Sequence, residues 1–328
     1  MWYSAVGWFV TCTLGLLAVP PITMAQPQGK RPLVGVLEPE SQQRSACIAA
    51  FQQGLRDLGY VEGQTIAFAY RAAEEHPDRL AALAAELVQL TPDVLWLHST
   101  PAAWAAKRAT TTIPIVVAVA SELVEQGLVA SLARPGGNLT GLDFRTAELL
   151  GKQLELFKEA VPTITRVAVL VDPARADLVG VPSTMAQEAL ALGVQLQRVE
   201  AGRPDTFEAA FAAMGQSGAD ALLIMEGATF ARNRQRLLDL ARLHRLPTTA
   251  GGRHFAEAGS LLAYGEDVRE ICQRSAGLVD KIVKGATPAD LPVERADKFY
   301  LVVNLKTAQA LGLTLSPTFL FQADEVIK

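Results

Sequence analysis

Short apolar runs alternate with helical patterns along the first part of the chain. Apolar residues recur at helical spacing from Cys47 to Leu58 and stop at Gly59. Further helical patterns open at Pro77 and at Pro101. The predicted strands between them are residues 32–37, 65–70, 93–98 and 113–120. Strands that alternate with helices in this way predict a parallel sheet that is covered by helices.

The same alternation begins again after residue 165. The predicted strands are residues 166–171, 194–200 and 219–225, and the predicted helices are residues 181–193 and 205–218. Asp205 and Glu208 have capping-box spacing at the start of the second of these helices. Between the two series, residues 123–133 are predicted to form a helix that Pro135-Gly136-Gly137 stops.

Landmarks recur between the two series. Leu58-Gly59 and Leu192-Gly193 each end a first helix, and Pro77-Asp78 and Pro204-Asp205 each open a second one. Asp93 follows Asp78 at the distance that separates Asp220 from Asp205, and each later Asp leads into an apolar strand. Duplication of a βαβαβ unit is the preferred interpretation, and chance agreement is the alternative. Two such units predict a ligand site at the carboxyl ends of their strands.

Length and charge narrow the class of protein. The 328 residues suffice for two domains, and half of them are apolar. The formal net charge is -4 and no long basic run is present, so a nucleic-acid partner is not expected.

The first 25 residues carry no charged side chain. An apolar core from Val6 to Val19, then Pro20-Pro21 and a small residue at Ala25, resembles an export signal peptide. We therefore predict cleavage after about Ala25 and a periplasmic mature protein. Because no Lys or Arg precedes the apolar core, a short uncleaved anchor is the alternative. Cys12 lies inside the core without a lipobox-like setting, which argues against a lipoprotein.

The mature chain would keep two cysteines, Cys47 and Cys272. Both lie on apolar helical faces, so we predict buried free thiols. A disulfide between them, favoured by an oxidising compartment, is the alternative.

Ordered stretches of the sequence resemble the substrate-binding proteins of ABC importers, in the branch that includes tryptophan-binding-type proteins. They run from about Leu33 to Lys328 and read FQQGLRDLGYVEGQ, RLAALAAELV, TPAAWAAKRATTTIPIV, GLVASLARPGGNLTGL, HFAEAGSLLAYG, KIVKGATPADLPV, LVVNLKTAQALGL and ADEVI. The resemblance implies an α/β fold of the type I periplasmic binding class, with two similar Rossmann-like lobes whose parallel sheets are joined by a multi-strand hinge.

The resemblance also implies an organisation and a function. The expected domains are a signal peptide at 1–25, an N-terminal lobe at 26–143 plus 266–292, and a C-terminal lobe at 144–265 plus 293–328. The implied function is a non-enzymatic receptor that captures a small, amino-acid-like molecule in a cleft between the lobes, with an aromatic one among the options, and delivers it to an ABC permease and its ATPase. A receptor of similar fold that reports its ligand to a membrane signalling partner is the alternative. A monomer, peripheral to the membrane and without a cofactor, is expected.

The loops at the strand ends supply the candidate ligand-binding residues. They are Glu38, Ser41, Gln42, His98, Ser99, Thr100, Ser121 and Glu122 in the first lobe, and Asp172, Arg175, Glu226, Thr229, Arg253 and His254 in the second. Ser99, Thr100 and the N–H groups of the helix that opens at Pro101 are expected to hold a carboxylate, with an ordinary helix cap as the alternative. Asp172 is the first choice for an ammonium group, and a turn at Asp172-Pro173 is the alternative.

Other features bear on specificity. Ser121-Glu122-Leu123 stands where similar proteins often read Gly-Asp-Pro, so tryptophan specificity is not transferred to this chain. Trp104, Phe230, Phe255 and Tyr264 offer rings for stacking on a ligand, with core packing the expected role of at least two. The histidines show no metal-binding spacing, and no nucleophile elbow or P-loop is present, so neither catalytic nor metal-binding residues are expected. Asn138-Leu139-Thr140 fits a glycosylation pattern but is interpreted as the exit from the first lobe.

Overall fold

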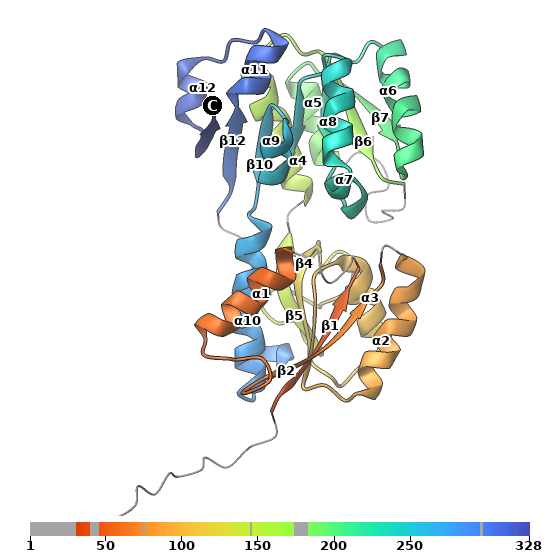
Figure 1. The fold of residues 1–328 in the computed structure, drawn as a ribbon, viewed down its shortest axis with the longest axis vertical. Coiled ribbons are helices and arrows are strands. Elements are labelled where there is room, and N and C mark those ends of the chain that lie inside the picture. The colour runs from red at the N-terminus through yellow and green to blue at the C-terminus, as the bar shows by residue number, and fades with distance from the viewer. Residues whose placement is uncertain (1–30, 40–45, 75, 145, 174–182, 296–297) are drawn as a thin grey trace, which may run out of the picture. The chain divides into compact units, whose positions relative to one another are not determined.

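The computed structural model describes residues 31–39, 46–74, 76–144, 146–173, 183–295 and 298–328 (Figure 1). The predicted signal peptide therefore lies outside the described residues. The chain divides into the segment Met1–Arg31 and one unit, Pro32–Lys328, and the unit contains two sheets. The elements around the six-stranded sheet form the first lobe, and those around the seven-stranded sheet form the second lobe. None of the helices in the described ranges has the length and apolar character needed to cross a membrane.

The first lobe is built on a fully parallel sheet of order β11-β5-β4-β3-β1-β2. Its elements are β1 (Leu33–Glu38), α1 (Ala46–Asp57), β2 (Ala67–Ala72), α2 (Leu80–Gln89), β3 (Val94–Leu97), α3 (Thr100–Ala109), β4 (Ile115–Ser121), β5 (Leu139–Phe144), α10 (Val268–Val283) and β11 (Glu294–Arg295). Short 3₁₀ turns lie at Pro77–Arg79 and Pro288–Asp290. The strands predicted from the apolar runs are all present, with bounds shifted by one or two residues.

Helices cover both faces of this sheet, so its strands are apolar on both sides. Val94 and Trp96 of β3 face α1 and α10, in one core cluster that also contains Phe51. Leu95 and Leu97 face α2 and α3 in the other cluster. This alternation follows from the two-residue period of a strand, and it fixes which side chains of β3 reach α10.

The second lobe is built on a sheet of order β13-β12-β10-β9-β8-β6-β7, in which only the β10–β12 pair is antiparallel among the described strands. Its elements are α4 (Thr146–Ala160), β6 (Arg166–Val171), α5 (Ser183–Ala191), β7 (Gln195–Glu200), the 3₁₀ turn Pro204–Thr206, α6 (Phe207–Gln216), β8 (Ala221–Ile224), α7 (Ala228–Arg232), α8 (Arg234–Leu243), β9 (Thr248–Ala250), α9 (Arg253–Ala258), β10 (Leu262–Gly265), β12 (Tyr300–Asn304), α11 (Leu305–Leu311), α12 (Pro317–Phe321) and β13 (Glu325–Ile327). Apolar residues of α4, α5, α11 and α12 fill one core cluster, and those of α6, α7, α8 and α9 fill another.

The predicted internal repeat is present in the structure. Val34 of β1 pairs with Val94 of β3, and Val167 of β6 pairs with Ala221 of β8, each at the start of a run of parallel partners. Gly59 and Gly193 both have positive φ, +89° and +66°, and so end their helices in the left-handed region that glycine adopts most readily. The two βαβαβ units therefore share register and helix ends as well as sequence landmarks.

Two local predictions are wrong. Residues 123–133 form turns and bends instead of a helix, because Gly127 has φ +70° and both Leu128 and Val129 donate back to the carbonyl of Leu123. The capping box is also absent. Asp205 binds Arg203, and Glu208 binds Arg236 of α8, so both carboxylates are taken by guanidinium groups on the surface.

Three connections lead from one sheet to the other: β5 to α4, β10 to α10, and β11 to β12. Because β11 pairs with β5, Glu294–Arg295 belongs to the first sheet, and the last connection follows residue 295 instead of residue 292. The rings of Tyr264 and Phe299 stack with centroids 6.0 Å apart, so the end of β10 packs on the residue that precedes β12.

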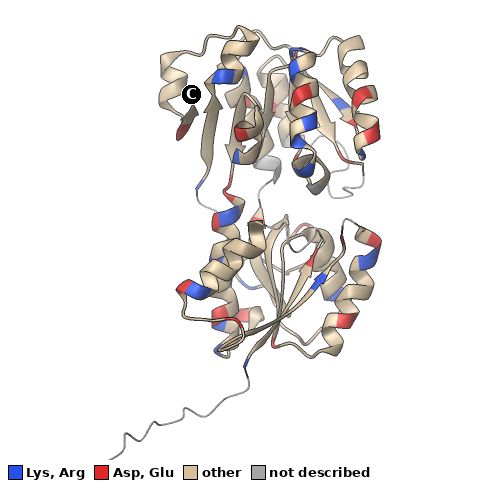
Figure 2. Ribbon diagram, viewed as in Figure 1, with Lys and Arg blue, Asp and Glu red and all other residues tan. Residues whose placement is uncertain are grey.

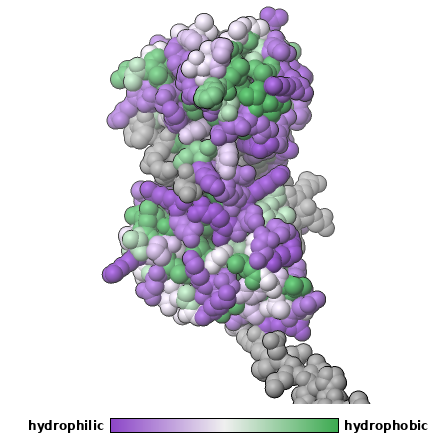
Figure 3. Space-filling view, turned by 90° about the vertical axis from the view of Figure 1, so that its left-hand side faces the viewer, coloured by the Kyte–Doolittle hydropathy of each residue, from purple (hydrophilic) through white to green (hydrophobic). Residues whose placement is uncertain are grey.

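Charged residues lie mainly on helices and loops, while most of the strand length is uncharged (Figure 2). On the face shown in Figure 3, hydrophilic residues surround separate apolar patches. Phe321 of α12, Leu190 of α5 and Leu243 of α8 are the most exposed large apolar side chains of the described chain, at 92%, 83% and 75%. All three belong to helices of the second lobe.

Candidate functional site

The carboxyl ends of β1 and β3 bring Glu38 and His98 together. Oε1 of Glu38 lies 2.5 Å from Nε2 of His98, and the two side chains are 1% and 13% exposed. Burying a carboxylate is unfavourable unless it is hydrogen-bonded or paired with a charge, and His98 supplies such a partner. Two of the predicted site residues thus form one polar group at the edge of the sheet where ligands bind in open α/β folds.

The start of α3 lies next to this pair in the sequence. The Ser99 hydroxyl accepts a hydrogen bond from the N–H of Ala102 at 3.3 Å, and Pro101 occupies the first turn. The Thr100 hydroxyl accepts from the N–H of Ser121 at 3.3 Å and so ties α3 to the end of β4. Both hydroxyls therefore have structural partners. Ser99 forms the ordinary helix cap that was the alternative to a carboxylate site. The positive end of the helix still lies at the carboxyl edge of the sheet.

The loop after β4 carries Ser121 and Glu122. Glu122 has φ +57°, and the carbonyl of Ser121 accepts from Nε2 of Gln126 at 2.9 Å. The next residue, Leu123, donates its N–H to Oδ1 of Asp143 at 2.9 Å. A buried carboxylate on β5 thus fixes the backbone of this loop and the direction in which it leaves the sheet.

In the second lobe, Asp172 and Glu226 follow β6 and β8. Asp172 is buried, 8% exposed, directly after the strand. Oε1 of Glu226 accepts the N–H of Gly252, and Nε2 of His254 lies 4.0 Å from the same oxygen. Glu226 is therefore joined to the loop between β9 and α9, and an acidic group stands at the end of each of these strands.

Other predicted residues lie elsewhere. Arg253 binds Glu257 at 2.9 Å and Glu325 at 2.6 Å, and the hydrogen bond that Arg253 donates to Glu257 raises the pKa of the guanidinium. Its side chain is about half exposed and bridges α9 to β13. Ser41, Gln42 and Arg175 lie outside the described residues.

The four candidate aromatic residues have separate environments. Phe230 and Phe255 are fully buried in the core of the second lobe, which confirms core packing for two of them. Nε1 of Trp104 donates to Gln126, and its ring lies 5.4 Å from the guanidinium of Arg108. Tyr264 packs on Phe299 at the connection between the sheets.

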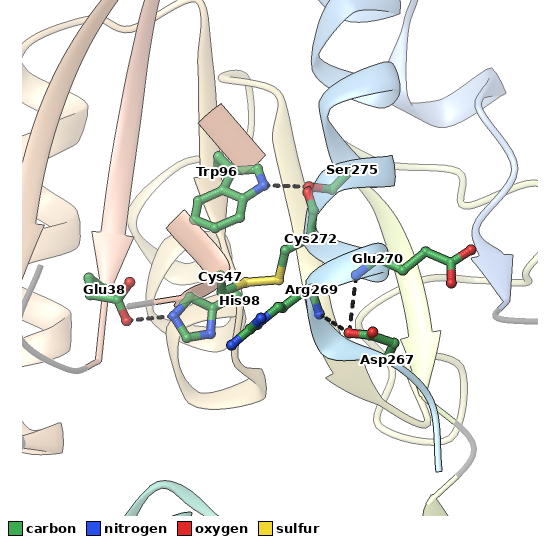
Figure 4. Close-up of a disulfide and its surroundings, with 9 residues drawn as sticks. All are labelled: Glu38, Cys47, Trp96, His98, Asp267, Arg269, Glu270, Cys272 and Ser275. Atoms are coloured by element: carbon green, nitrogen blue, oxygen red, sulfur yellow. Dashed lines mark hydrogen bonds and ion pairs between the residues drawn. A yellow bond between two sulfur atoms is a disulfide. The ribbon is translucent and has the colours of Figure 1, made fainter. Parts of the chain in front are cut away.

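The cysteine prediction is wrong: Cys47 of α1 and Cys272 of α10 form a disulfide, with Cα atoms 5.3 Å apart (Figure 4). That separation lies within the usual range for a disulfide. The apolar faces predicted for the two cysteines are faces that the helices present to each other. Gly54 of α1 makes this possible, because a Cβ at this position would lie 2.8 Å from Cβ of Ala276 and closer still to the carbonyl oxygen of Gln273.

Arg269 and Trp96 were not predicted as site residues. Arg269 lies on the first turn of α10, and its side chain extends toward His98 in Figure 4. The ring centroid of Trp96 lies 5.9 Å from that of His98. Arg269 follows closely after β10, and this position at a strand end was a signal from which a site residue could have been predicted. The sequence around Trp96 offers no such signal, because it is that of an ordinary buried strand. No cluster of three or more potential metal ligands occurs among the described side chains.

The two sheets, their repeat and the polar residues at their strand ends define a type I periplasmic binding fold, the class of several similar solved structures. Residues 34–327 match the family described as ABC transporter substrate binding protein, and the chain belongs to that family. It is therefore a substrate-binding protein of the ABC transporter family, whose members are extracytoplasmic solute receptors.

Several individual proteins are similar to this chain. A tyrosine-binding protein of Clostridioides difficile is 27% identical over 269 residues, which cover 80% of this chain and 75% of the relative. A conserved domain protein of Vibrio cholerae is 28% identical with a TM-score of 0.83, and the match covers 90% of this chain and 100% of the other. An ABC domain from Streptococcus pneumoniae in complex with L-Trp is 24% identical with the same TM-score and the same coverage.

Proposed function

We propose that this protein is a receptor without catalytic activity that captures an amino acid with an aromatic side chain and delivers it to an ABC permease. The Glu38–His98 pair beside the start of α3 is the observation that carries the proposal. It places a buried carboxylate, an imidazole and a helix N-terminus at the carboxyl edge of one sheet. In open α/β folds, this edge is the usual ligand position.

The zwitterion of an amino acid matches the charges at the two sheet edges. Its carboxylate would meet the N-terminus of α3 and the guanidinium of Arg269, which both favour negative charge. Its ammonium group would meet Asp172 of the second lobe, with Glu226 as the neighbouring acid. In this proposal the two lobes bind opposite ends of the zwitterion, so the ligand favours the closed arrangement of the hinge.

The relatives support the ligand class. One is named a tyrosine-binding protein, and one solved structure contains L-Trp. Family membership supports an ABC permease and its ATPase as partners. The apolar, uncharged start of the chain supports export before the receptor acts, with cleavage after about Ala25.

A thermal-shift screen tests the ligand class. The oxidised mature chain is heated with glycine, with each of the other nineteen amino acids as the L- and the D-isomer, and with nucleobases and small carboxylates. A ligand that binds only the folded state raises the melting temperature as its concentration increases. We expect L-tyrosine, L-tryptophan or L-phenylalanine to give the largest shift and their D-isomers to give less. A larger shift with a nucleobase or with an aliphatic carboxylate would contradict the proposal.

Isothermal titration calorimetry then tests the site. The variant Ser99→Ala/Asp172→Ala should bind the hit at least tenfold more weakly, the equivalent of about 1.4 kcal/mol. Ser99 also caps a helix, so the matched control is Ser316→Ala/Asp205→Ala. Ser316 caps α12 through the N–H of Phe319, and Asp205 is a surface acid. Unchanged affinity in the site variant, or equal loss in both variants, would show that these residues do not hold the ligand.

A further inference from the structure

We propose that the Cys47–Cys272 disulfide and Trp96 are positioning groups for the Glu38–His98 pair, and through it for ligand binding to the first lobe. This inference rests on the proposed function, because it assigns these groups a role in the same site. Neither sulfur is expected to touch the ligand. The disulfide acts through two helices and one indole ring, all of which belong to the first lobe.

The disulfide joins parts of the first lobe that are far apart in the sequence. Cys47 and Cys272 are separated by 225 residues, and α4 to β10 of the second lobe lie between them in the sequence. The helix α10 enters the first lobe directly from β10, through Glu266 and Asp267. The disulfide therefore fixes the beginning of α10 to α1 at the point where the chain arrives from the other lobe.

About one helical turn beyond each cysteine, a side chain holds Trp96. The ring of Phe51 on α1 stacks on the indole with centroids 4.2 Å apart and planes 10° apart. On α10, the hydroxyl of Ser275 accepts a hydrogen bond from Nε1 of Trp96 at 2.8 Å and donates to the carbonyl of Cys272 at 2.6 Å. Trp96 is fully buried. Its position therefore depends on both helices that the disulfide connects.

Trp96 in turn supports His98. The two residues are two positions apart at the end of β3, so their side chains lie on the same face of the sheet. The centroids of their rings are 5.9 Å apart. His98 then binds Glu38, whose side chain is 1% exposed. A contiguous set of contacts thus runs from the disulfide through Phe51 and Ser275 to Trp96, and from there to the polar pair.

Besides the disulfide, α1 and the segment that follows it make other contacts with α10. Gly54 packs on Ala276, and the hydroxyl of Tyr60 donates to Oδ1 of Asp280 at 2.9 Å. These contacts hold α1 and α10 together without the disulfide, so the fold of the lobe has other support. What the disulfide adds is restraint at the hinge end of α10, where opening and closing of the lobes would otherwise displace the first turn and Ser275.

The first test uses the variant Cys47→Ala/Cys272→Ala and needs no ligand. The chain has four histidines, so their imidazole ¹H–¹³C signals can be assigned by substitution. At fixed pH, we expect the His98 signals and the Trp96 indole N–H signal to shift, and those of His76 and His244 to stay in place. His244 packs on Phe211 in the second lobe, so it serves as an internal control.

The second test is affinity for the hit of the thermal-shift screen, measured below the unfolding range of every variant. The double cysteine variant should bind the hit about fivefold to tenfold more weakly. Such a change is at the lower end of the coupling found between two separate sites in one protein. Tyr60→Phe is the matched control, because it removes a contact between the segment after α1 and the last turn of α10, away from the disulfide. It should lower the melting temperature and leave both the His98 signals and the affinity unchanged.

If the double cysteine variant does not fold, Ser275→Ala takes its place, since it removes the acceptor of the Trp96 N–H and keeps the disulfide. A variant that is less stable but has unchanged His98 signals and affinity would overturn the positioning role. If the His98 signals shift in the variant but the wild-type chain binds none of the probes, the proposed function is overturned and the positioning role is not. The two failures are therefore distinguishable.

Discussion

The carboxylate of Asp93 accepts the backbone N–H of Leu33 at 2.7 Å, across a separation of 60 residues. Asp220 holds the corresponding strand start in the second lobe, with hydrogen bonds from the N–H groups of Thr165 and Arg166 and from the Thr165 hydroxyl. Each aspartate precedes the third strand of its unit, β3 or β8, and fixes the beginning of the first strand, β1 or β6, which is its neighbour in the sheet. The two Asp residues that marked the repeat in the sequence thus have one structural role.

Replacing these aspartates should destabilise the protein unequally. We expect Asp220→Ala to lower the free energy of unfolding by about 2 kcal/mol and Asp93→Ala by about 1 kcal/mol, because the first loses three hydrogen bonds and the second loses one. Urea denaturation measures both. Asp239→Ala, which removes only exposed contacts with Arg242 and Gln235, should change stability by less than about 0.5 kcal/mol. Equal effects of all three would refute the role assigned to the two landmarks.

Gly54→Ala should separate α1 from α10. The added Cβ would meet Ala276 and the backbone of Gln273, which cannot move aside like the end of a flexible side chain. We expect a loss of about 1–3 kcal/mol, measured by thermal and chemical unfolding. Gly277→Ala on α10 is the control, because no other atom lies within 4 Å of the Cβ that this substitution adds. It should stabilise the helix by about 0.5–1 kcal/mol, and the prediction is wrong if the two changes have the same sign.

Removing the disulfide should lower the stability of the ligand-free protein. The closed loop is long, so the loop-entropy argument gives an upper value of about 5 kcal/mol, and about 2–5 kcal/mol is typical. Guanidinium denaturation of the double cysteine-to-alanine variant, compared with the oxidised wild type, measures the loss. A midpoint within error of the wild type would show that the remaining α1–α10 contacts suffice.

Stability should fall in alkaline solution between about pH 10 and pH 12. Burial raises the pKa of Tyr70 to about 12, and the charge of Glu62 adds to the effect. Burial and the hydrogen bond to Asp280 likewise raise the pKa of Tyr60 to about 12. An unfolded tyrosine ionises near pH 10, so over this range the unfolded state loses protons that the folded state keeps. The stability that the protonated Tyr60 and Tyr70 contribute is therefore complete below about pH 10 and is lost as the pH rises toward 12.

Unfolding free energies at pH 9, 10, 11 and 12 check this dependence. Tyr70→Phe should flatten the curve, because the ionisable hydroxyl is gone, while the hydroxyl contact with Gln52 is lost at every pH. Absorbance near 295 nm follows tyrosinate formation in the folded protein directly. Ionisation of all tyrosines near pH 10 in the folded state would contradict the prediction.

Much of the fold could be predicted from the sequence. The strands 32–37, 93–98 and 166–171 follow from apolar runs, and the repeat follows from matched Leu-Gly, Pro-Asp and Asp landmarks. Two predictions from local patterns failed, because the residues involved bind partners that the local pattern does not include. Residues 123–133 have helical spacing, but Gly127 turns the chain, and Asp143 on β5 fixes Leu123 instead. Asp205 and Glu208 have cap spacing, but nearby arginines bind them.

The candidate site was predictable only as a list of residues at strand ends. The sequence placed Glu38 and His98 at the same sheet edge, because parallel strands end on one side, but it gave no reason to pair them. It also ranked Arg253 with them, and Arg253 instead binds Glu257 and Glu325. The direction of a side chain at a strand end depends on the neighbours that other elements bring.

By itself, the sequence determined the alternation of strands and helices, the internal repeat and the edges where polar residues gather, because these depend on local periodicity and chain order. The tertiary structure decided that Cys47 meets Cys272, that Trp96 lies between Phe51 and Ser275, and that His98 binds Glu38. These contacts join residues 45 to 225 positions apart, counting from Phe51–Trp96 to the disulfide. The packing of α1 and α10 on one face of the first sheet brings the cysteines, Phe51, Trp96 and Ser275 together, and the pairing of β1 with β3 brings His98 to Glu38. No local pattern encodes either arrangement.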